Sequence, residues 1–248
     1  MVVVIVKVPD IIMSYNTSKG FWSLIVKYIV DYGNEESIVI DGVDNIKISN
    51  LSFGYDSAVL NNISFDLVKN DFVLIKGESG CGKSTLVKLI GKVIKQQGMI
   101  SVNGVSLEDI TFKSYYKYVS FLSQKAVILN KNIEENITLN KEGDLSFALE
   151  FVNLKDMVDK FDNGVYTSCN NLSDGEKQKI ALARAIYQNK DVLILDEALS
   201  AMDEYSRRAI AGNLLKYASN GKIVIVVSHE KEVEDYANKT VLLSKGDL

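Results

Sequence analysis

The spacing of hydrophobic positions along the chain predicts two kinds of β-strand. Apolar and polar residues alternate in IKISNLSF (46–53) and ISFDL (63–67), as they do in strands with one buried face. Continuous apolar runs occupy FVLIK (72–76), DVLILDE (191–197) and IVIVVSH (223–229), as expected for strands that are buried on both faces of a sheet. The chain therefore combines half-buried strands near its beginning with fully buried strands further on.

Three segments repeat apolar residues at the period of an amphipathic helix. The first is FWSLIVKYIVDYG (21–33), which ends at Gly33; the second follows residue 83, and the third is NLSDGEKQKIALARAI (171–186). In the third, Ser173 occupies the N-cap position and Glu176 follows three residues later, which predicts a capping box. The positions expected to face a core are, helix by helix, Phe21, Leu24, Ile25, Tyr28 and Ile29; Leu86, Leu89, Ile90, Val93 and Ile94; and Leu182, Ala183 and Ile186.

Composition narrows the class of protein. The chain has 248 residues, 47% hydrophobic and 24% charged, which is ordinary for a globular protein with a sizeable core. The net charge of −4 provides no overall basic field, so no nucleic-acid partner is expected. Two cysteines, Cys81 and Cys169, suggest no disulfide framework and fit a reducing compartment. The opening stretch MVVVIVKVPDIIM carries Lys7 and Asp10 and falls short of the roughly 18 apolar residues that a membrane span needs.

The second predicted helix is preceded by a glycine-rich motif. GESGCGKST has the spacing G-x-x-x-x-G-K-[ST] and lies between a predicted strand and a predicted helix, which is the context that the motif requires. Glycines allow backbone N–H groups to converge on phosphate oxygens, and the helix N-terminus adds partial positive charge. Lys83 is expected to reach the β- and γ-phosphates, and Ser84 to bind Mg²⁺. The residues expected to bind ATP here are Gly77, Glu78, Ser79, Gly80, Cys81, Gly82, Lys83, Ser84 and Thr85.

Two acidic residues end the predicted strand at DVLILDE. Ligands of open α/β sheets bind outside the carboxyl ends of the strands. Asp196 is therefore expected to hold Mg²⁺ through water, and Glu197 to orient or deprotonate an attacking water. His229, the only histidine, ends another apolar strand at the same predicted edge.

Seven motifs resemble those of the nucleotide-binding domain of ABC transporters, and they follow one another along the chain in the order that this family has. The resemblance covers about residues 45–248. The phosphate motif looks like its Walker A and LILDE like its Walker B. The other counterparts are the adenine-stacking Tyr55 in FGYDS, the Q-loop Gln124 in FLSQ, the signature LSDGEKQ with Ser173, Gly175 and Glu176, the D-loop SAMD ending in Asp203, and the H-loop VVSHE with His229. The resemblance implies that Gln124 contributes to catalysis and to the Mg²⁺ site, and that His229 contacts the γ-phosphate.

The subtype that the chain resembles is the exporter. SQKAVILNKNIEENI and KISNLSFGYD are similar to exporter-type domains, particularly those of peptide and bacteriocin exporters. In that light residues 1–44 resemble the end of a last transmembrane helix and its linker, with Pro9 where such a chain leaves the membrane. The implied fold is α/β, a P-loop NTPase with a RecA-like core, an antiparallel β subdomain around residues 45–75 and a helical subdomain from about 108 to 185.

The resemblance also implies a mechanism. Two such domains pack head-to-tail around two ATP molecules, and hydrolysis with Mg²⁺ powers export, a peptide being one candidate cargo. Ser173 Oγ and the Gly175 N–H would contact the γ-phosphate held by the partner, since a helix N-terminus attracts anions. The expected partners are a second nucleotide-binding domain and transmembrane domains, at the cytoplasmic face of the cell membrane.

Two departures from the family pattern bear on these expectations. The signature reads LSDGE, with Asp174 and Glu176 in place of glycine and glutamine, and the stretch before it is only YTSCNN (166–171), where exporters carry T-x-V-G-E-x-G. Two other classes stay open: a soluble ABC-type ATPase with a partner outside the membrane, and a P-loop kinase. The signature argues against the kinase, whereas buried contacts of residues 1–36 with the domain would favour the soluble ATPase.

Overall fold

The computed structural model describes residues 38–55, 58–95 and 98–244. The helix expected at 21–33, Pro9 and the contacts of residues 1–36 lie outside the described residues. Within the described part, two β-sheets and the helices around them share two hydrophobic cores.

A five-stranded parallel sheet forms the centre of the molecule. In order across the sheet, its strands are β6 (Val119–Leu122), β7 (Val192–Asp196), β8 (Ile223–Val227), β3 (Phe72–Gly77) and β9 (Lys239–Leu243). Three of them are the continuous apolar runs, so the prediction of fully buried strands is confirmed. Because every neighbouring pair is parallel, the carboxyl ends of all five strands lie at one edge.

A four-stranded sheet with antiparallel pairing lies beside the first. In order, its strands are β2 (Ala58–Val68), β1 (Asn45–Gly54), β4 (Ile100–Val102) and β5 (Val105–Ser106). β1 and β2 correspond to the two alternating segments. The range expected for this sheet, 45–75, needs two corrections, because β4 and β5 extend the sheet and β3 belongs to the parallel sheet.

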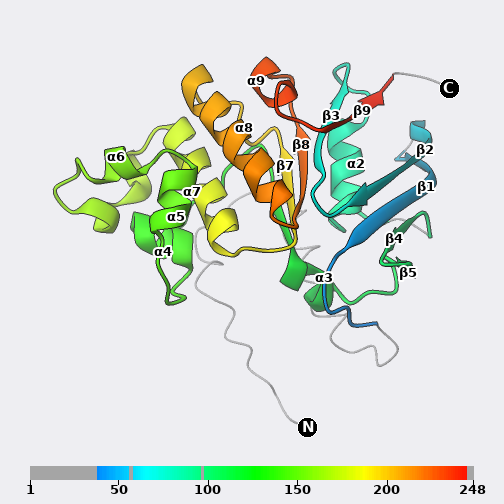
Figure 1. Ribbon diagram of the computed structural model, residues 1–248, viewed down its shortest axis with the longest axis horizontal. Helices are drawn as coiled ribbons and strands as arrows, with labels where there is room; N and C mark the ends of the chain where they lie inside the picture. The colour runs from blue at the N-terminus through cyan, green and yellow to red at the C-terminus, as the bar shows by residue number, and fades with distance from the viewer. Residues whose placement is uncertain (1–37, 56–57, 96–97, 245–248) are drawn as a thin grey trace, which may run out of the picture.

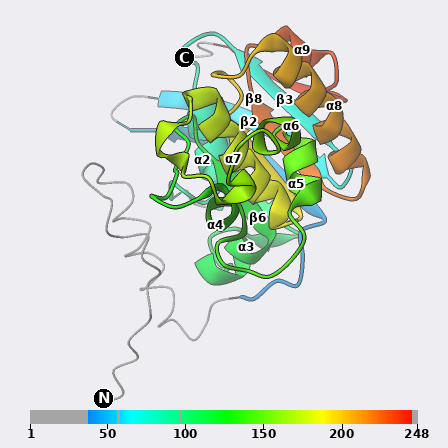
Figure 2. The same cartoon turned by 90° about the vertical axis from the view of Figure 1, so that its left-hand side faces the viewer.

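Helices cover both faces of the parallel sheet. Alternate side chains of β3 point into different cores: Val73 and Ile75 pack with α2, whereas Phe72 and Leu74 pack with α7 and α8. Figure 2 shows α2 and α8 on opposite sides of β3 and β8. The helices in chain order are α2 (Lys83–Ile90), α3 (Phe112–Tyr118), α4 (Ile133–Thr138), α5 (Ser146–Phe151), α6 (Lys155–Val158), α7 (Asp174–Tyr187), α8 (Glu204–Ser219) and α9 (Lys231–Glu234), with 3₁₀ turns η2 (Gly164–Tyr166) and η3 (Cys169–Asn171).

The helices α4 to α7 stand at one end of the molecule, opposite the antiparallel sheet (Figure 1). The range expected for a helical subdomain, about 108–185, also contains β6, which pairs with β7 in the parallel sheet. The apolar positions Leu182, Ala183 and Ile186 of α7 are buried as predicted. No helix among the described residues has the length and hydropathy of a membrane-spanning helix.

The helix after the phosphate motif is shorter than its apolar pattern predicts. α2 ends at Ile90, with Gly91 as its C-cap, and Lys92 adopts a φ of 54° in the left-handed region. Val93 and Ile94, which were expected on the helix, therefore lie beyond it, although Ile94 still packs against the core on the α2 side.

Candidate nucleotide-binding site

The glycine-rich loop connects β3 to α2 at the edge where the parallel strands end. A Cβ atom at Gly77 would collide with the carbonyl oxygen of Leu243 in β9, and one at Gly82 would lie 2.7 Å from Leu60 Cδ2 in β2. Gly82 also has a φ of 96°, which favours glycine. Glycine is therefore required at position 77 by the close approach of the β9 backbone and at position 82 by its left-handed conformation.

The other loop residues differ in exposure. Glu78, Ser79 and Gly80 form an exposed turn, Cys81 is buried beneath it, and Thr85 is half-buried in the first turn of α2. The backbone N–H of Cys81 donates to the Glu78 carbonyl at 3.3 Å, which closes this turn. The loop thus keeps a compact base while its outer turn faces solvent.

Lys83 folds back into the loop from the first position of α2. Its side chain is only 6% exposed, and its Nζ donates to the carbonyls of Gly77 and Glu78, both at 2.8 Å. A lysine ammonium has three N–H donors, so one remains for another oxygen. The positive charge is therefore held where a phosphate in the loop can reach it.

Ser84 and Asp196 bring two oxygen atoms together next to the loop. Asp196 is 5% exposed at the end of β7, and its Oδ1 accepts a hydrogen bond of 2.8 Å from Ser84 Oγ. The two residues are 112 positions apart in sequence, and the parallel pairing of β7 and β8 with β3 brings them together. This pair joins the phosphate loop to the acidic end of β7.

Gln124 and Glu197 form a second polar pair at the same edge. Gln124 follows β6, and its Nε2 donates to Glu197 Oε2 at 3.0 Å. Glu197 has a φ of 52°, an uncommon conformation for a residue other than glycine, and its N–H donates to Val227 of β8 at 3.1 Å. The backbone at Glu197 is thereby fixed with its carboxylate toward the loop after β6.

His229 and Tyr55 are placed near this edge with fewer contacts. Asp196 pairs with Val227 at the ends of β7 and β8. His229 is two residues beyond Val227, so it lies just past the end of β8, on the same side as Glu197, and it is exposed. Tyr55 is 65% exposed after β1, and its ring packs edge-on to Phe53 with centroids 5.2 Å apart. Among the described residues, neither side chain forms a hydrogen bond or an ion pair with the phosphate loop.

The signature turn begins α7 and has the predicted capping box. Ser173 Oγ accepts from the Glu176 N–H at 3.3 Å, and Glu176 Oε2 accepts from the Ser173 N–H at 2.7 Å and from its hydroxyl at 2.8 Å. Asp174, which stands where the family has glycine, is exposed. A Cβ atom at Gly175 would lie 2.7 Å from the Ala201 carbonyl oxygen, so this glycine allows α7 to touch the D-loop.

The D-loop ends in a capped helix. Asp203 is the N-cap of α8, and its carboxylate accepts from the Ser206 N–H at 2.9 Å and from the Ser206 hydroxyl at 2.6 Å. These two donors keep the pKa of Asp203 below its usual value, because they favour the charged carboxylate. Lys179 of α7 donates to Ser206 Oγ at 2.7 Å and links the two helices.

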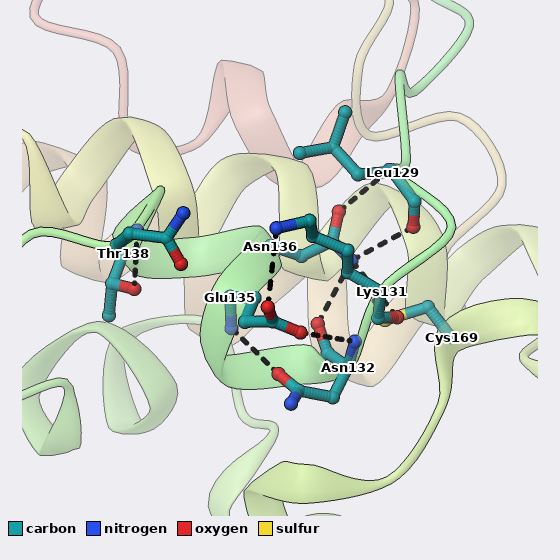
Figure 3. Close-up of polar contacts among 8 residues, drawn as sticks. Leu129, Lys131, Asn132, Glu135, Asn136, Thr138 and Cys169 are labelled. Atoms are coloured by element: carbon teal, nitrogen blue, oxygen red, sulfur yellow. Dashed lines mark hydrogen bonds and ion pairs between the residues drawn. The ribbon is translucent and has the colours of Figure 1, made fainter. Parts of the chain in front are cut away.

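A buried amide orders the chain between Gln124 and α4. Asn136 is fully buried; its Nδ2 lies within hydrogen-bond distance of the carbonyls of Leu129, Lys131 and Asn132, and its Oδ1 accepts from the Leu129 N–H at 2.8 Å (Figure 3). Arg184 of α7 donates to the same Oδ1 at 2.9 Å. This network ties the segment after the Q-loop to α7.

Comparison with known proteins agrees with this geometry. A family model described as ABC transporter matches residues 60–200, more than half of the chain. The chain belongs to the ABC transporter family. This membership, expected from the motifs, leaves the P-loop kinase without support.

The most similar relatives of this ABC transporter chain include exporters. The ATP-dependent lipid A-core flippase of Aliivibrio fischeri is 33% identical over 233 residues, covering 88% of this chain and 39% of the flippase. The beta-(1→2)glucan export ATP-binding/permease protein NdvA of Rhizobium etli is 32% identical over 223 residues, covering 86% of this chain and 38% of NdvA. A solved structure of a bacterial Atm1-family ABC exporter with ATP bound is similar with a TM-score of 0.76 and 26% identity, covering 85% of this chain and 39% of that one.

These relatives support an exporter-type nucleotide-binding domain, as the sequence predicted. The chain spans about two-fifths of the length of the relatives that it matches.

One contact at the site was not predicted from the sequence, namely that of Gln178 with both the Q-loop and the D-loop. The signal for it is a polar residue at a position of α7 where the helical period expects an apolar one.

Proposed function

We propose that this chain binds and hydrolyses ATP as the nucleotide-binding part of an ABC exporter. The observation that carries the proposal is the pair of hydrogen bonds beside the phosphate loop, from Ser84 to Asp196 and from Gln124 to Glu197. They gather a phosphate-binding loop, oxygen atoms suited to a divalent cation and a carboxylate suited to water activation at one edge of the sheet. In-line attack of water on a phosphoryl group needs these three parts.

Each residue has a role that follows from its place. Lys83 binds the β- and γ-phosphates, and the exposed ring of Tyr55 stacks on the adenine. The Glu197 carboxylate accepts a proton from the attacking water, and Gln124, bonded to it, orients that water. His229 contacts the γ-phosphate from the end of β8, which stabilises the charge that develops in the transition state.

The oxygen atoms at this edge fit Mg²⁺. This ion prefers oxygen ligands and is usually held by one or two carboxylates together with the substrate's phosphates. The Ser84 hydroxyl and the Asp196 carboxylate are already adjacent, and Gln124 can add its amide oxygen. When bound, Mg²⁺ supplies positive charge to the phosphate oxygens.

The signature turn serves the ATP held by a second copy of this domain. α7 packs on the sheet face that contains Leu74, whereas α2, which carries Lys83, packs on the opposite face with Ile75. A head-to-tail dimer lets Ser173 Oγ and the Gly175 N–H reach the partner's γ-phosphate, with Asp203 at the same interface. The Ser173 hydroxyl has to turn from Glu176 to do so, and the Glu176 carboxylate still accepts the Ser173 N–H.

The exporter relatives support a proposal for the partners of the assembled protein. This domain would lie at the cytoplasmic face of the membrane, and transmembrane domains would receive the motion that ATP binding and hydrolysis produce in it. The relatives are named for lipid A-core and beta-(1→2)glucan, so these names give a peptide cargo no support. The residues of the nucleotide site select no cargo, and we assign none.

The proposal is tested by steady-state ATP hydrolysis of Glu197→Gln. Losing the general base lowers turnover by about 10²–10⁴-fold. ATP affinity is kept, because the phosphate loop is unchanged. Glu142→Gln, an exposed position in the connection between α4 and α5, is the matched control and hydrolyses ATP at the unmutated rate. Wild-type turnover in Glu197→Gln would contradict the assignment of the base, and absence of ATPase activity in the unmutated chain would contradict the proposed function.

A further inference from the structure

Gln178 is a buried polar residue of α7 that the roles above leave unused. Its side chain is 7% exposed, and its neighbours along the helix, Ile180 and Leu182, are fully buried. An amide at such a position destabilises the fold unless its hydrogen-bonding groups are satisfied. Here the donor and the acceptor of the side chain each have one partner.

The two ends of the Gln178 amide bind different loops of the nucleotide site. Its Nε2 donates to the backbone carbonyl of Gln124 at 3.2 Å, and its Oε1 accepts from the backbone N–H of Ala201 at 3.0 Å. The side chain of the same Gln124 donates to Glu197. One side chain thus joins the Q-loop, the D-loop and the signature helix.

The start of α7 and the D-loop are attached at two further points. Gly175 lies so close to the D-loop that an added Cβ atom would be 2.7 Å from the Ala201 carbonyl oxygen, and Lys179 donates to the Ser206 hydroxyl, which in turn donates to Asp203. A shift of the D-loop backbone therefore pulls on the first turn of α7. The bond to the Gln124 carbonyl is the one link in this set that also reaches the loop after β6.

We propose that Gln178 is a positioning residue that couples the ATP site of its own subunit to the signature turn that serves the partner's ATP. The inference rests on the proposed function, because it requires the signature to act across a dimer. On one side Gln178 holds the loop whose side chain orients Glu197. Through its other end Gln178 holds the D-loop, against which the turn of Ser173 and Gly175 packs. The Q-loop and the D-loop therefore move together, or else a buried hydrogen bond of Gln178 breaks.

Two substitutions separate the halves of the amide. Gln178→Met keeps the size and removes both hydrogen bonds, whereas Gln178→Glu keeps an acceptor for Ala201 and loses the donor to Gln124. We expect kcat to fall about tenfold in Gln178→Met and by a similar factor in Gln178→Glu, with KM for ATP unchanged, because neither bond touches the nucleotide. Gln188→Met, at the C-cap of the same helix, is the control and retains the unmutated kcat; thermal unfolding of each variant reports any loss of fold.

A single-site mixture tests the coupling itself. Chains carrying Ser173→Arg keep the phosphate loop but lack the signature, and chains carrying Lys83→Ala have the opposite defect, so only their mixed dimer contains one complete site. Gln178→Met is then placed in one chain or in the other. The account predicts about tenfold slower hydrolysis in both placements. If Gln178→Met slows hydrolysis in only one placement, or in neither, while the mixture without Gln178→Met is active, the coupling is overturned and the shared site is upheld. If the mixture without Gln178→Met is no more active than its separate components, the proposed dimer is overturned and the coupling with it.

Discussion

Lys83 illustrates how a single residue depends on the backbone around it. Its ammonium is nearly buried, yet the carbonyls of Gly77 and Glu78 keep it hydrogen-bonded, so the charge is stable within the loop before any phosphate arrives. A charge-assisted hydrogen bond to phosphate is stronger than a neutral one. The same site would bind an anion poorly without this charge.

Lys83→Ala is therefore expected to weaken ATP binding by about 10–100-fold, the equivalent of about 1.5–3 kcal/mol for a hydrogen bond to a charged group. Calorimetric titration with ATP measures the change. Lys88→Ala, five positions further along α2, serves as the control and keeps the affinity. Unchanged affinity in Lys83→Ala would remove this lysine from the site.

Asp174 is the least expected residue of the signature. A carboxylate in the first turn stabilises its own helix by about 0.3–1 kcal/mol, but it would repel a γ-phosphate if it pointed at one. In the structure it is exposed, and the capping box is made by Ser173 and Glu176 without it. Its side chain is thus dispensable for the cap.

Asp174→Gly should accordingly change ATPase activity and ATP-driven dimerisation less than threefold, whereas Ser173→Arg should abolish both. Steady-state assays and size-exclusion chromatography in a Glu197→Gln background measure these effects. A tenfold gain in dimerisation for Asp174→Gly would show that the carboxylate weakens the native signature.

At the scale of elements, Asn136 holds the segment between the Q-loop and α4 in place. Its amide is fully buried, and both Leu129 and Arg184 depend on it for hydrogen bonds. Asn136→Ala leaves several buried polar groups without partners, so we expect the free energy of unfolding to fall by about 2–4 kcal/mol. Urea denaturation measures it; Asn163→Ala, at an exposed turn, should change it by less than about 0.5 kcal/mol, and a similarly small change in Asn136→Ala would contradict the network's role.

The elements also show which features a sequence can reveal. β3, β7 and β8 were predictable because a strand that is buried on both faces consists of consecutive apolar residues. β4 and β5 have three and two residues, too few for any period, and β6 was hidden in a range read as helical. The phosphate loop is a local motif, whereas Gln178 meets partners 54 and 23 positions away; the helical period marks Gln178 as a polar residue at an apolar position, but it does not identify those partners.

At the scale of the whole molecule, the arrangement of layers supports the proposal that one chain alone does not form a complete ATP site. The phosphate loop precedes a helix on one face of the parallel sheet, and the signature begins a helix on the other face. We therefore propose that two chains share two ATP molecules across a head-to-tail interface.

The most direct test of this claim is the molar mass of Glu197→Gln measured by light scattering during size-exclusion chromatography. With ATP and Mg²⁺ the account predicts a dimer, with twice the 27.5 kDa of one chain. A chain that carries both Glu197→Gln and Ser173→Arg is predicted to stay a monomer. A monomer that has bound ATP, as shown by calorimetry on the same sample, would contradict the shared site.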